Sequence, residues 1–432
     1  MLKSNILNNL KTRGFINDCT DLMGLDNLLS TSKVTCYIGY DATASSLHVG
    51  HLMNIMMLRW FQKDGHRPII LLGGGTTKIG DPSFRKTERP LITDETINAN
   101  LLSLKSIFSK YLYFSSDYPG ALMLNNDEWL SKLNYLDFLR DTGKHFSINR
   151  MLSFESVKSR LQKNDPLSFL EFNYMILQGY DFYKLNQDYQ CILQMGGSDQ
   201  WGNIVNGIEL TRRMNGNKLF GLTSPLLTNS SGQKMGKSSS GAVWLNEENL
   251  SPYEFWQFWR NCDDDDIEKF LLLFTEFSVD KIKELTSRKG HHLNEAKIVL
   301  ANEVTTLCHG KIKADEAFQT SNAVFRENIR SSKLPTIEIN AKDCPERISI
   351  TQLMTLSGMV KSGKEAKRLV NENAVKLEGR MIKDITEKFE KIHAKLHLFV
   401  LAIFIHDVSE IEKSAGPGAL YTIFSAFSYK SS

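Results

Sequence analysis

Two histidines three residues apart could act on a phosphate group. His48-Val-Gly-His51 follows a turn-prone segment and begins an apolar, Met-rich stretch that predicts a helix. Backbone N–H groups at a helix N-terminus favour an anion, imidazoles there can donate to phosphate oxygens, and Gly50 would let a flat adenine or ribose approach the backbone. Two other interpretations stay open: the histidines could cap or pack the helix, or they could bind zinc with Cys36, although a fourth ligand is lacking.

Two lysines downstream could act on the same group. Lys234-Met-Gly-Lys237-Ser238 lies in a stretch rich in Gly and Ser, which predicts a mobile loop. Lysines on such a loop can close over a triphosphate and neutralise the charge that develops on departing pyrophosphate, which stabilises the transition state. Alone, the segment is typical of a solvated basic loop. Its pairing with the two histidines, in this order, favours a catalytic function.

The segments around these motifs predict a parallel sheet. Residues 34–40 and 68–73 have the composition of buried strands, and the predicted helix at 51–61 connects them. A strand–helix–strand unit with a glycine-rich exit is typical of a doubly wound α/β domain with right-handed crossovers. We expect mainly helical, charged segments from 94 to 190, and a further strand at 190–195.

Changes in composition divide the rest of the chain. The segment from 251 to about 330 predicts a separate helical domain, and its polar exit predicts a linker. Residues 349–389 form a small unit whose basic excess is as large as the +3 of the whole chain. The expected domains are a catalytic domain at 1–245 with a helical insertion at about 115–190, a helical domain at 246–330, a linker at 331–347, a small α+β unit at 348–390 and an atypical tail at 391–432.

Composition excludes several classes of protein. The chain has 432 residues, of which 41% are hydrophobic and 23% charged, as in ordinary globular proteins of several domains. Its longest apolar run, 398–405, is too short to span a bilayer. The six cysteines are scattered and form no CxxC pair, and no signal-like segment begins the chain, so a cytoplasmic location is expected. A net charge of +3 means that any nucleic-acid surface must be local.

The sequence resembles the class I aminoacyl-tRNA synthetases, and specifically the bacterial-type tyrosyl-tRNA synthetase family, from about residue 6 to 387. Segments that stand in the family order carry the resemblance, and these are residues 37–41, 42–51, 80–82, 171–181, 194–201 and 234–238. The resemblance implies a Rossmann-like catalytic domain, and the small C-terminal unit resembles an S4 RNA-binding domain. Because the family's own first helix begins near residue 4, no cleaved presequence is expected.

The resemblance also implies a role for individual residues. Those implied to bind tyrosine are Tyr37 and Asp181 at the phenolic hydroxyl, and Asp81, Tyr174 and Gln178 at the α-ammonium group. Those implied to bind ATP are Asp41, Gly50, Gly197, Asp199, Lys237 and Ser238, with Gln194 and Gln200 in the same cleft. His48, His51, Lys234 and Lys237 are the implied catalytic residues, with Mg²⁺ bound through the ATP phosphates and no metal held by the protein. Residues implied to contact tRNA are Lys361, Lys364, Lys367 and Arg368.

The implied reaction joins tyrosine to tRNA(Tyr). The carboxylate of L-tyrosine attacks the α-phosphate of ATP, and a 3′-terminal ribose hydroxyl of the tRNA then takes the tyrosyl group. The family is dimeric, with the segment around Phe169 near the subunit interface. Ile38 and Asn54 depart from residues that are often cysteine and threonine in the family.

Three alternatives remain at this point. A stand-alone nucleotidylyltransferase would lack the lysine loop and the two RNA-facing domains. A catalytically silent RNA-binding protein would have lost the histidines or lysines. A tryptophan-specific relative is disfavoured because indole has no hydroxyl group to satisfy both Tyr37 and Asp181.

Overall fold

The computed structural model describes most of the chain. The described residues are 2–83, 91–238, 241–287, 291–327, 336–338, 347–357, 360, 362–371, 375–377, 380–390 and 426–428. The chain divides into two compact units, Met1–Asp315 and Glu316–Ser432. The predicted boundary between 245 and 246 therefore lies inside the first unit, and α16 (Lys311–Glu327) spans the division.

A six-stranded sheet forms the core of the first unit, in the order β1-β6-β5-β2-β3-β4. Its parallel strands are β2 (Thr35–Asp41), β3 (Arg67–Gly73), β4 (Leu122–Asn125), β5 (Cys191–Gly197) and β6 (Phe220–Ser224), and β1 (Asp18–Cys19) is antiparallel to β6. The chain builds β3 and β4 on one side of β2 and then returns to build β5 and β6 on the other. The doubly wound α/β prediction is confirmed, and the strand order reverses between β2 and β5, where such folds bind ligands.

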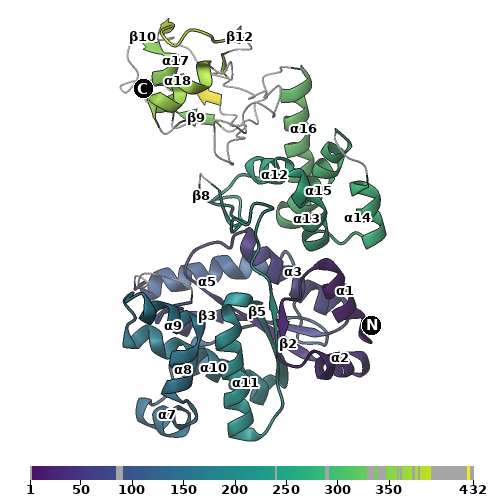
Figure 1. Ribbon diagram of the computed structural model, residues 1–432, viewed down its shortest axis with the longest axis vertical. Helices are drawn as coiled ribbons and strands as arrows, with labels where there is room; N and C mark the ends of the chain where they lie inside the picture. The colour runs from purple at the N-terminus through teal and green to yellow at the C-terminus, as the bar shows by residue number, and fades with distance from the viewer. Residues whose placement is uncertain are drawn as a thin grey trace. The chain divides into compact units, whose positions relative to one another are not determined.

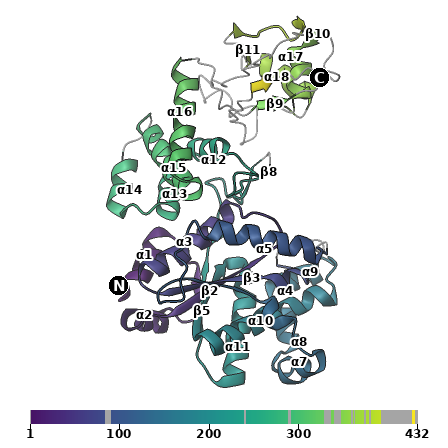
Figure 2. The ribbon, with the colours of Figure 1, turned by 180° about the vertical axis from the view of Figure 1, so that it is seen from behind.

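Helices flank this sheet on both sides (Figures 1 and 2). α3 (Val49–Lys63) packs on β2 and β3 and against α1 (Asn5–Arg13), while α10 (Phe169–Tyr189) and α11 (Trp201–Asn215) pack on β5 and on each other. A glycine allows the last two helices to approach closely, since a Cβ at Gly207 would lie 2.9 Å from the Phe182 side chain. Among the residues described, no helix has the length and apolar content to cross a membrane.

β4 was not predicted, and it lies inside the segment expected to be helical. Leu122–Asn125 is only four residues long, and its Leu and Met residues are equally common in helices. Pairing with the completed edge of β3 makes it a strand, with Ile69 opposite Leu122 and Leu72 opposite Asn125. The rest of the segment is helical as expected, in α6 (Asp127–Leu130), α7 (Tyr135–Asp141), α8 (Ile148–Ser153), α9 (Glu155–Gln162) and α10.

The polypeptide after the sheet forms the predicted helices. They are α12 (Pro252–Arg260), α13 (Ile267–Phe274), α14 (Val279–Thr286) and α15 (His291–His309). Ser251 begins α12 in a capping box with Glu254. Buried aromatic rings join the helices, with the Trp259 ring centroid 5.6 Å from that of Phe270 and 5.0 Å from that of Phe274.

The second unit contains a small α+β arrangement. β10 (Arg347–Ser349) pairs antiparallel with β13 (Lys388–Glu390), and β11 (Lys376–Leu377) pairs with β12 (Arg380–Met381). α17 (Ile350–Leu356) packs against α18 (Gly363–Asn371). β9 (Thr336–Glu338), inside the predicted linker, pairs in parallel with β14 (Ala426–Ser428) of the predicted tail.

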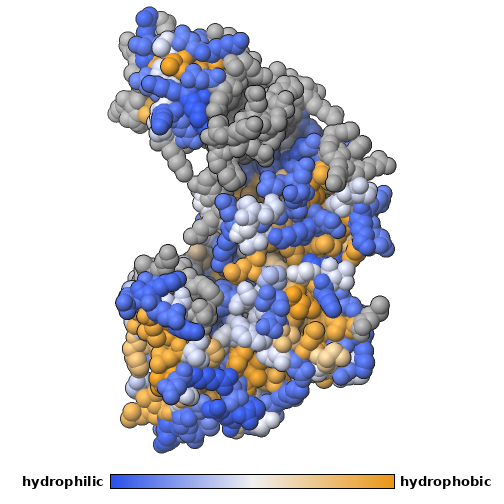
Figure 3. Space-filling model, in the orientation of Figure 1, coloured by the Kyte–Doolittle hydropathy of each residue, from blue (hydrophilic) through white to orange (hydrophobic). Residues whose placement is uncertain are grey.

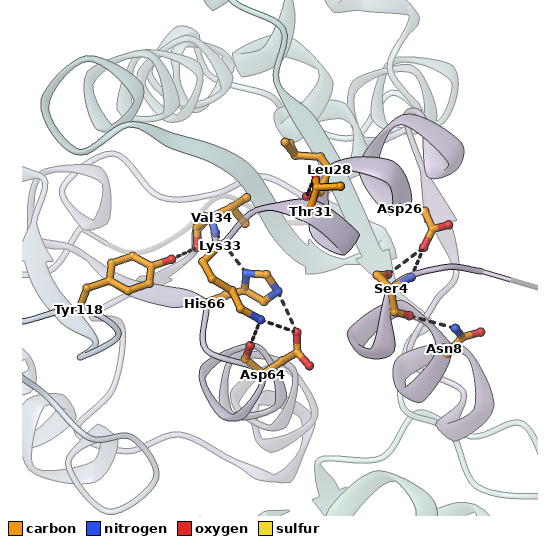
Figure 4. A network of polar contacts seen from close by, with 10 residues as sticks. All are labelled: Ser4, Asn8, Asp26, Leu28, Thr31, Lys33, Val34, Asp64, His66 and Tyr118. Carbon is orange, nitrogen blue, oxygen red and sulfur yellow. Dashed lines mark hydrogen bonds and ion pairs between the residues drawn. The ribbon is translucent and has the colours of Figure 1, made fainter.

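A polar network fixes the amino ends of β2 and β3 (Figure 4). The Tyr118 hydroxyl donates to the Val34 carbonyl at 3.1 Å, and the Val34 N–H donates to Nδ1 of His66 at 3.2 Å. His66 Nε2 lies 3.2 Å from an Asp64 carboxylate oxygen, while burial lowers the pKa of His66 to about 4. This network fixes the amino ends of the strands. The polar groups of the candidate site lie at their opposite, carboxyl ends.

Candidate active site

The carboxyl ends of the parallel strands bring polar side chains together. Asp41 ends β2, and its two carboxylate oxygens accept hydrogen bonds from the Thr76 hydroxyl at 2.7 Å and the Tyr174 hydroxyl at 3.0 Å. Gly73 ends β3 beside it, where a Cβ would lie 2.3 Å from Asp41 Oδ1. Asp41 is thus held between α10 and the turn after β3, next to the point where the strand order reverses.

Tyr37 and Asp181 form a buried polar pair behind Asp41. Asp181 accepts from Asn126 Nδ2 at 2.9 Å and from Trp129 Nε1 at 2.7 Å, yet burial raises the pKa of its carboxyl group to about 7. The Tyr37 hydroxyl is buried and has no hydrogen-bond partner among the described residues. Burial, and then the charge of Asp181, raise the pKa of Tyr37 well above its usual value. A buried polar atom without a hydrogen-bond partner destabilises the folded state by about 1–3 kcal/mol. The Tyr37–Asp181 pair therefore favours the binding of a polar ligand.

The charges of three carboxylates act on the Tyr174 hydroxyl, of which Asp41 alone accepts a hydrogen bond from it. Burial raises the pKa of Tyr174 well above normal, and Asp41, Asp81 and Asp181 raise it further, so all three act on this hydroxyl group. Asp81 accepts from Gln200 Nε2 at 3.0 Å. The buried Oε1 atom of Gln178 has no partner within the described chain, and the same holds for Oε1 of Gln194. Negative charge and unpaired acceptors suit a cation such as an amino acid's ammonium group.

His48 and His51 lie at the N-terminus of α3. His48 is the N-cap residue, and its Nδ1 accepts from the Gly50 N–H at 3.1 Å, while His51 Nδ1 accepts from the His48 N–H at 3.2 Å. The two ring centroids are 4.0 Å apart. Burial lowers the pKa of His51 well below normal, and His48 and Lys234 add to the effect. The low pKa favours the neutral imidazole of His51, and both histidines cap α3 through their Nδ1 atoms.

The structure brings the lysine segment directly over these histidines. Gly236 has φ +117°, and a Cβ there would lie 3.1 Å from His48 Nδ1. The Val49 N–H donates to the Val243 carbonyl at 3.0 Å, and His48 forms an antiparallel bridge with Trp244, so the segment after the loop pairs with the start of α3. Lys234 is exposed and acts electrostatically on both His51 and Asp199. The two motifs, far apart in sequence, thus share one location in space.

Three glycines of this region have different surroundings. Gly39 is exposed in the middle of β2, and a Cβ at Gly50 would lie 2.8 Å from His48 Cε1. At Gly197 a Cβ would lie 2.5 Å from Asp199 Oδ1. Burial raises the pKa of Asp199, whereas Lys234 opposes this rise.

Some of the predicted site residues are not among those that the structure brings together at the carboxyl ends of the strands. Lys237 and Ser238 form the short strand β7 (Lys237–Ser238), which pairs with β8 (Gly241–Ala242), but their side chains lie outside the described part. Lys364, Lys367 and Arg368 are exposed on α18 in the second unit, and Lys361 lies outside the described residues. Among the described residues, no group of three or more His, Cys, Asp or Glu could hold a metal ion, so the alternative zinc site with Cys36 is not formed there.

Ile38 and Asn54, which were expected to depart from the resembled family, both contact the protein around the site. Ile38 is buried in β2. Asn54 Oδ1 accepts from the Ser224 hydroxyl at 2.9 Å, which ties α3 to the end of β6. Both side chains therefore stabilise the fold around the site.

Three residues of the site were missed by sequence reasoning. Thr76 binds Asp41, and Asn126 and Trp129 bind Asp181. The available signal was the short apolar run 122–124 followed by Asn125-Asn126-Asp127, a pattern typical of a strand that ends in a turn. Without β4 in the predicted sheet, nothing placed these side chains near Asp181.

Comparisons with known proteins identify the family of this chain. Residues 29–326 match the family described as tRNA synthetases class I (W and Y). The relative named Tyrosine--tRNA ligase from Cereibacter sphaeroides is 59% identical over 382 residues, covering 88% of this chain and 92% of that protein. The one from Roseobacter denitrificans is 60% identical over 376 residues, covering 87% and 90%.

Solved structures resemble the chain as well. A C-terminally truncated mitochondrial tyrosyl-tRNA synthetase from Aspergillus nidulans matches with a TM-score of 0.68 at 30% identity, covering 74% of this chain and 94% of that one. A tyrosyl-tRNA synthetase from Archaeoglobus fulgidus, complexed with L-tyrosine, shares the fold with a TM-score of 0.53 at 20% identity, covering 72% and 99%. The chain therefore belongs to the class I tRNA synthetases of the tryptophan and tyrosine group, and within it to the tyrosine–tRNA ligase family.

Proposed function

We propose that this protein is a tyrosine–tRNA ligase that forms tyrosyl-adenylate and pyrophosphate from L-tyrosine and ATP, and then charges tRNA(Tyr). One observation carries the substrate: the Tyr37 hydroxyl and the Asp181 carboxylate are buried together, and the hydroxyl group has no partner in the described chain. A phenolic hydroxyl can donate to the carboxylate and accept from Tyr37. Phenylalanine would leave the Tyr37 hydroxyl without a partner and offer Asp181 no further donor, and indole has no hydroxyl group that could serve both.

The acidic group at Tyr174 orients the other end of the amino acid. Asp41, Asp81 and Asp181 all act on the Tyr174 hydroxyl, and Gln178 offers an acceptor oxygen. An ammonium group held by Asp81, Tyr174 and Gln178 would turn the substrate carboxylate toward the start of α3. Holding the carboxylate beside the α-phosphate lowers the entropic barrier of the attack.

Positive and hydrogen-bonding groups lie on the phosphate side of the site. His48, His51 and Lys234 gather where α3 begins, and Lys237 follows Gly236 on the loop. Their proposed role is to stabilise the charge on the departing pyrophosphate, since they bind the triphosphate more strongly as that charge grows. Asp41, Gly50, Gly197, Asp199 and Ser238 are the proposed contacts of ATP.

Mg²⁺ is proposed to bind through oxygens of the ATP phosphates, where it would neutralise charge during transfer. The donor set fits this arrangement, because the residues facing the triphosphate are His and Lys. The described residues contain no carboxylate cluster that would hold the ion without ATP. The chain's own contribution is therefore to orient the phosphates.

tRNA binding and assembly complete the proposal. Exposed Lys364, Lys367 and Arg368 lie on α18, which favours contact with RNA phosphates from the second unit, with Lys361 beside them in sequence.

Figure 3 shows apolar surface on the side of the sheet domain where Figure 1 labels α8, α9 and α10. Phe169 is 71% exposed there, which supports a homodimer interface that sedimentation would test. The scattered cysteines support a cytoplasmic location.

ATP–pyrophosphate exchange tests the proposed function. Purified protein should exchange with tyrosine, and far less with phenylalanine or tryptophan. Tyr37→Phe should narrow the preference for tyrosine over phenylalanine, because it removes the buried hydroxyl group that phenylalanine leaves without a partner. Exchange with tryptophan alone would assign the tryptophan branch of the family, and no exchange with any amino acid would leave a silent RNA-binding protein.

A further inference from the structure

The loop that carries Lys234 and Lys237, here called the lysine loop, begins with a tight turn. This turn contacts the helical bundle formed by α12 to α15. Thr228 and Lys234 form an antiparallel bridge, and the Asn229 N–H donates to the Gln233 carbonyl at 2.9 Å. The Met235 N–H then donates to the Leu227 carbonyl at 2.8 Å, which delivers Gly236 onto the His48 ring. The turn therefore sets the position of Lys234 and of the residues that follow it.

Two residues from the start of α13 hold the outer side of this turn. The Ser230 N–H donates to Asp266 Oδ2 at 2.9 Å, and the Lys269 ammonium group donates to the Thr228 carbonyl. Asp266 is only 3% exposed, whereas Ser230 is exposed, so the carboxylate belongs to the bundle and the turn docks on it. Both contacts fall within three residues of the turn's bridge at Thr228.

The far end of the same helix is fastened to the sheet domain. Arg13 of α1 is buried and donates to the carbonyls of Leu272 at 2.9 Å, Thr275 at 3.0 Å and Phe277 at 2.5 Å. Glu276 pairs with Arg59 and with Lys63 near the end of α3. α13 is thus fixed against α1 and α3, and α3 carries His48 at its other end.

We propose that Asp266 and Lys269 are positioning residues of the adenylation reaction, which fix the distance and orientation of the lysine loop relative to His48 and His51. The inference rests on the proposed function, because it concerns that same triphosphate site. Neither residue touches the reacting atoms. Their contacts to Ser230 and Thr228 restrict the turn, and through it the backbone that carries Lys234 and Lys237.

The chemistry of these contacts fits a positioning role. A glycine-rich loop loses much conformational entropy when it orders, so fixed contacts at its base lower the cost of each closure. A buried carboxylate accepting a backbone N–H is among the stronger hydrogen bonds available to a loop. A misplacement of about 1 Å at catalytic groups is sufficient to slow a reaction by roughly 10²-fold.

Four full-length variants test the proposal against two controls. Asp266→Ala removes the acceptor, whereas Asp266→Asn keeps an amide oxygen that can still accept from Ser230. Lys269→Met keeps the aliphatic stem but loses the donor, and Asp266→Ala combined with Lys269→Met removes both contacts. The controls are Asp265→Ala, at an exposed neighbouring carboxylate, and Lys283→Met, at an exposed lysine of α14.

The measurements separate position from stability. Asp266→Ala should lower kcat for ATP–pyrophosphate exchange about tenfold, the effect of losing roughly one hydrogen bond to a charged group, with tyrosine Kd unchanged. Asp266→Asn should recover most of the rate, and the double variant should lose less than the product of the two single losses. In the absence of substrates, trypsin should cleave after Lys234 and Lys237 faster in Asp266→Ala and Lys269→Met than in the parent and controls.

Two results would overturn the inference. One is exchange and cleavage rates of Asp266→Ala and Lys269→Met that equal those of the parent. The other is a parallel fall of melting temperature, tyrosine affinity and rate, which would make these residues structural. If the parent itself exchanges with no amino acid, the proposed function fails, whereas the trypsin comparison still decides whether these residues hold the loop.

Discussion

Asp181 destabilises the empty protein, and its proposed role in substrate binding accounts for this. A carboxyl group with an ordinary pKa of 3.8 is buried here and has a pKa of about 7, despite the hydrogen bonds from Asn126 and Trp129. Nearby, the Tyr37 hydroxyl has no partner in the described chain. Selection for folding alone would favour an apolar pair at these positions, so the polar pair indicates a ligand.

The raised pKa of Asp181 gives a pH-dependent stability. The folded state holds this proton more tightly than the unfolded state, so the parent loses stability as pH rises from about 4 to about 7. Asp181→Asn cannot titrate. Its melting temperature relative to the parent should therefore rise between pH 5.5 and pH 8, corresponding to about 2 kcal/mol. Thermal melts at both pH values check this, and a difference that stays constant would show that Asp181 titrates normally.

Lys234 should act on the rate and not on amino acid affinity. It lies close enough to Asp199 and His51 to act on both electrostatically, on the side of the site where the phosphates are proposed to bind. Lys234→Ala should slow adenylation by roughly 10²-fold, because the charge it would stabilise develops only as pyrophosphate leaves. Rapid-kinetic measurement of adenylate formation, with tyrosine Kd from fluorescence, checks this.

A matched control accompanies this variant. Lys218→Ala removes an exposed lysine that pairs with Asp21, away from the site, and should leave both quantities unchanged. A weaker tyrosine affinity in Lys234→Ala at an unchanged rate would contradict the assignment.

Elements formed by strong local patterns were predicted correctly, and those formed by pairing were not. β2, β3 and β5 are largely apolar runs that end at Gly or Asp, and α3 begins at a polar N-cap, so local patterns are sufficient to predict them. β4 is four residues of mixed propensity, and the edge of β3 makes it a strand. The missed partners of Asp181 follow from the absence of β4 in the prediction, and β1 and β6 were not predicted either.

The contact between the histidine motif and the lysine motif, both proposed to bind phosphate, could be suggested from their residue types but was supported only by the family resemblance. Nothing in the local sequence of residues 234–238 encodes their position over His48. That position comes from the pairing of Val243 with Val49 and from contacts of Ser230 and Thr228 with α13. These are tertiary contacts between elements distant in sequence, which periodicity cannot reveal.

Arg13 links α1 to the end of α13, and its loss should weaken the first unit. Its guanidinium donates to three backbone carbonyls and lies 4.3 Å from the Trp60 ring centroid. Arg13→Ala leaves buried carbonyls without a donor. We therefore expect the free energy of unfolding to fall by about 3 kcal/mol, with a clear fall in melting temperature. Lys11→Ala, at an exposed position of the same helix, should change little. Equal melting temperatures for the two variants would show that solvent replaces these bonds at no cost.

At the scale of the whole molecule, the proposed chemistry and the proposed RNA contacts belong to different compact units. Every residue proposed to bind tyrosine or ATP lies between Tyr37 and Ser238 in the first unit, while α18 belongs to the second. On α18, Ala366 and Val370 are buried and Lys364, Lys367 and Arg368 are exposed, so the helix packs through one face and presents its basic residues to solvent. This arrangement predicts that adenylation and tRNA binding can be impaired separately.

A full-length triple variant tests that separation. Lys364→Ala, Lys367→Ala and Arg368→Ala together should leave tyrosine-dependent ATP–pyrophosphate exchange intact, because none of these residues lies in the first unit. The KM for tRNA in charging should rise. The log–log slope of tRNA affinity against salt should become shallower by roughly 2 to 3, since each lost phosphate contact contributes about 0.7 to 0.9. Lys105→Ala, an exposed lysine on α5 (Asp94–Phe108), is the control. An unchanged salt slope in the triple variant would show that α18 does not contact the tRNA backbone, and a loss of exchange would show that the two units do not act separately.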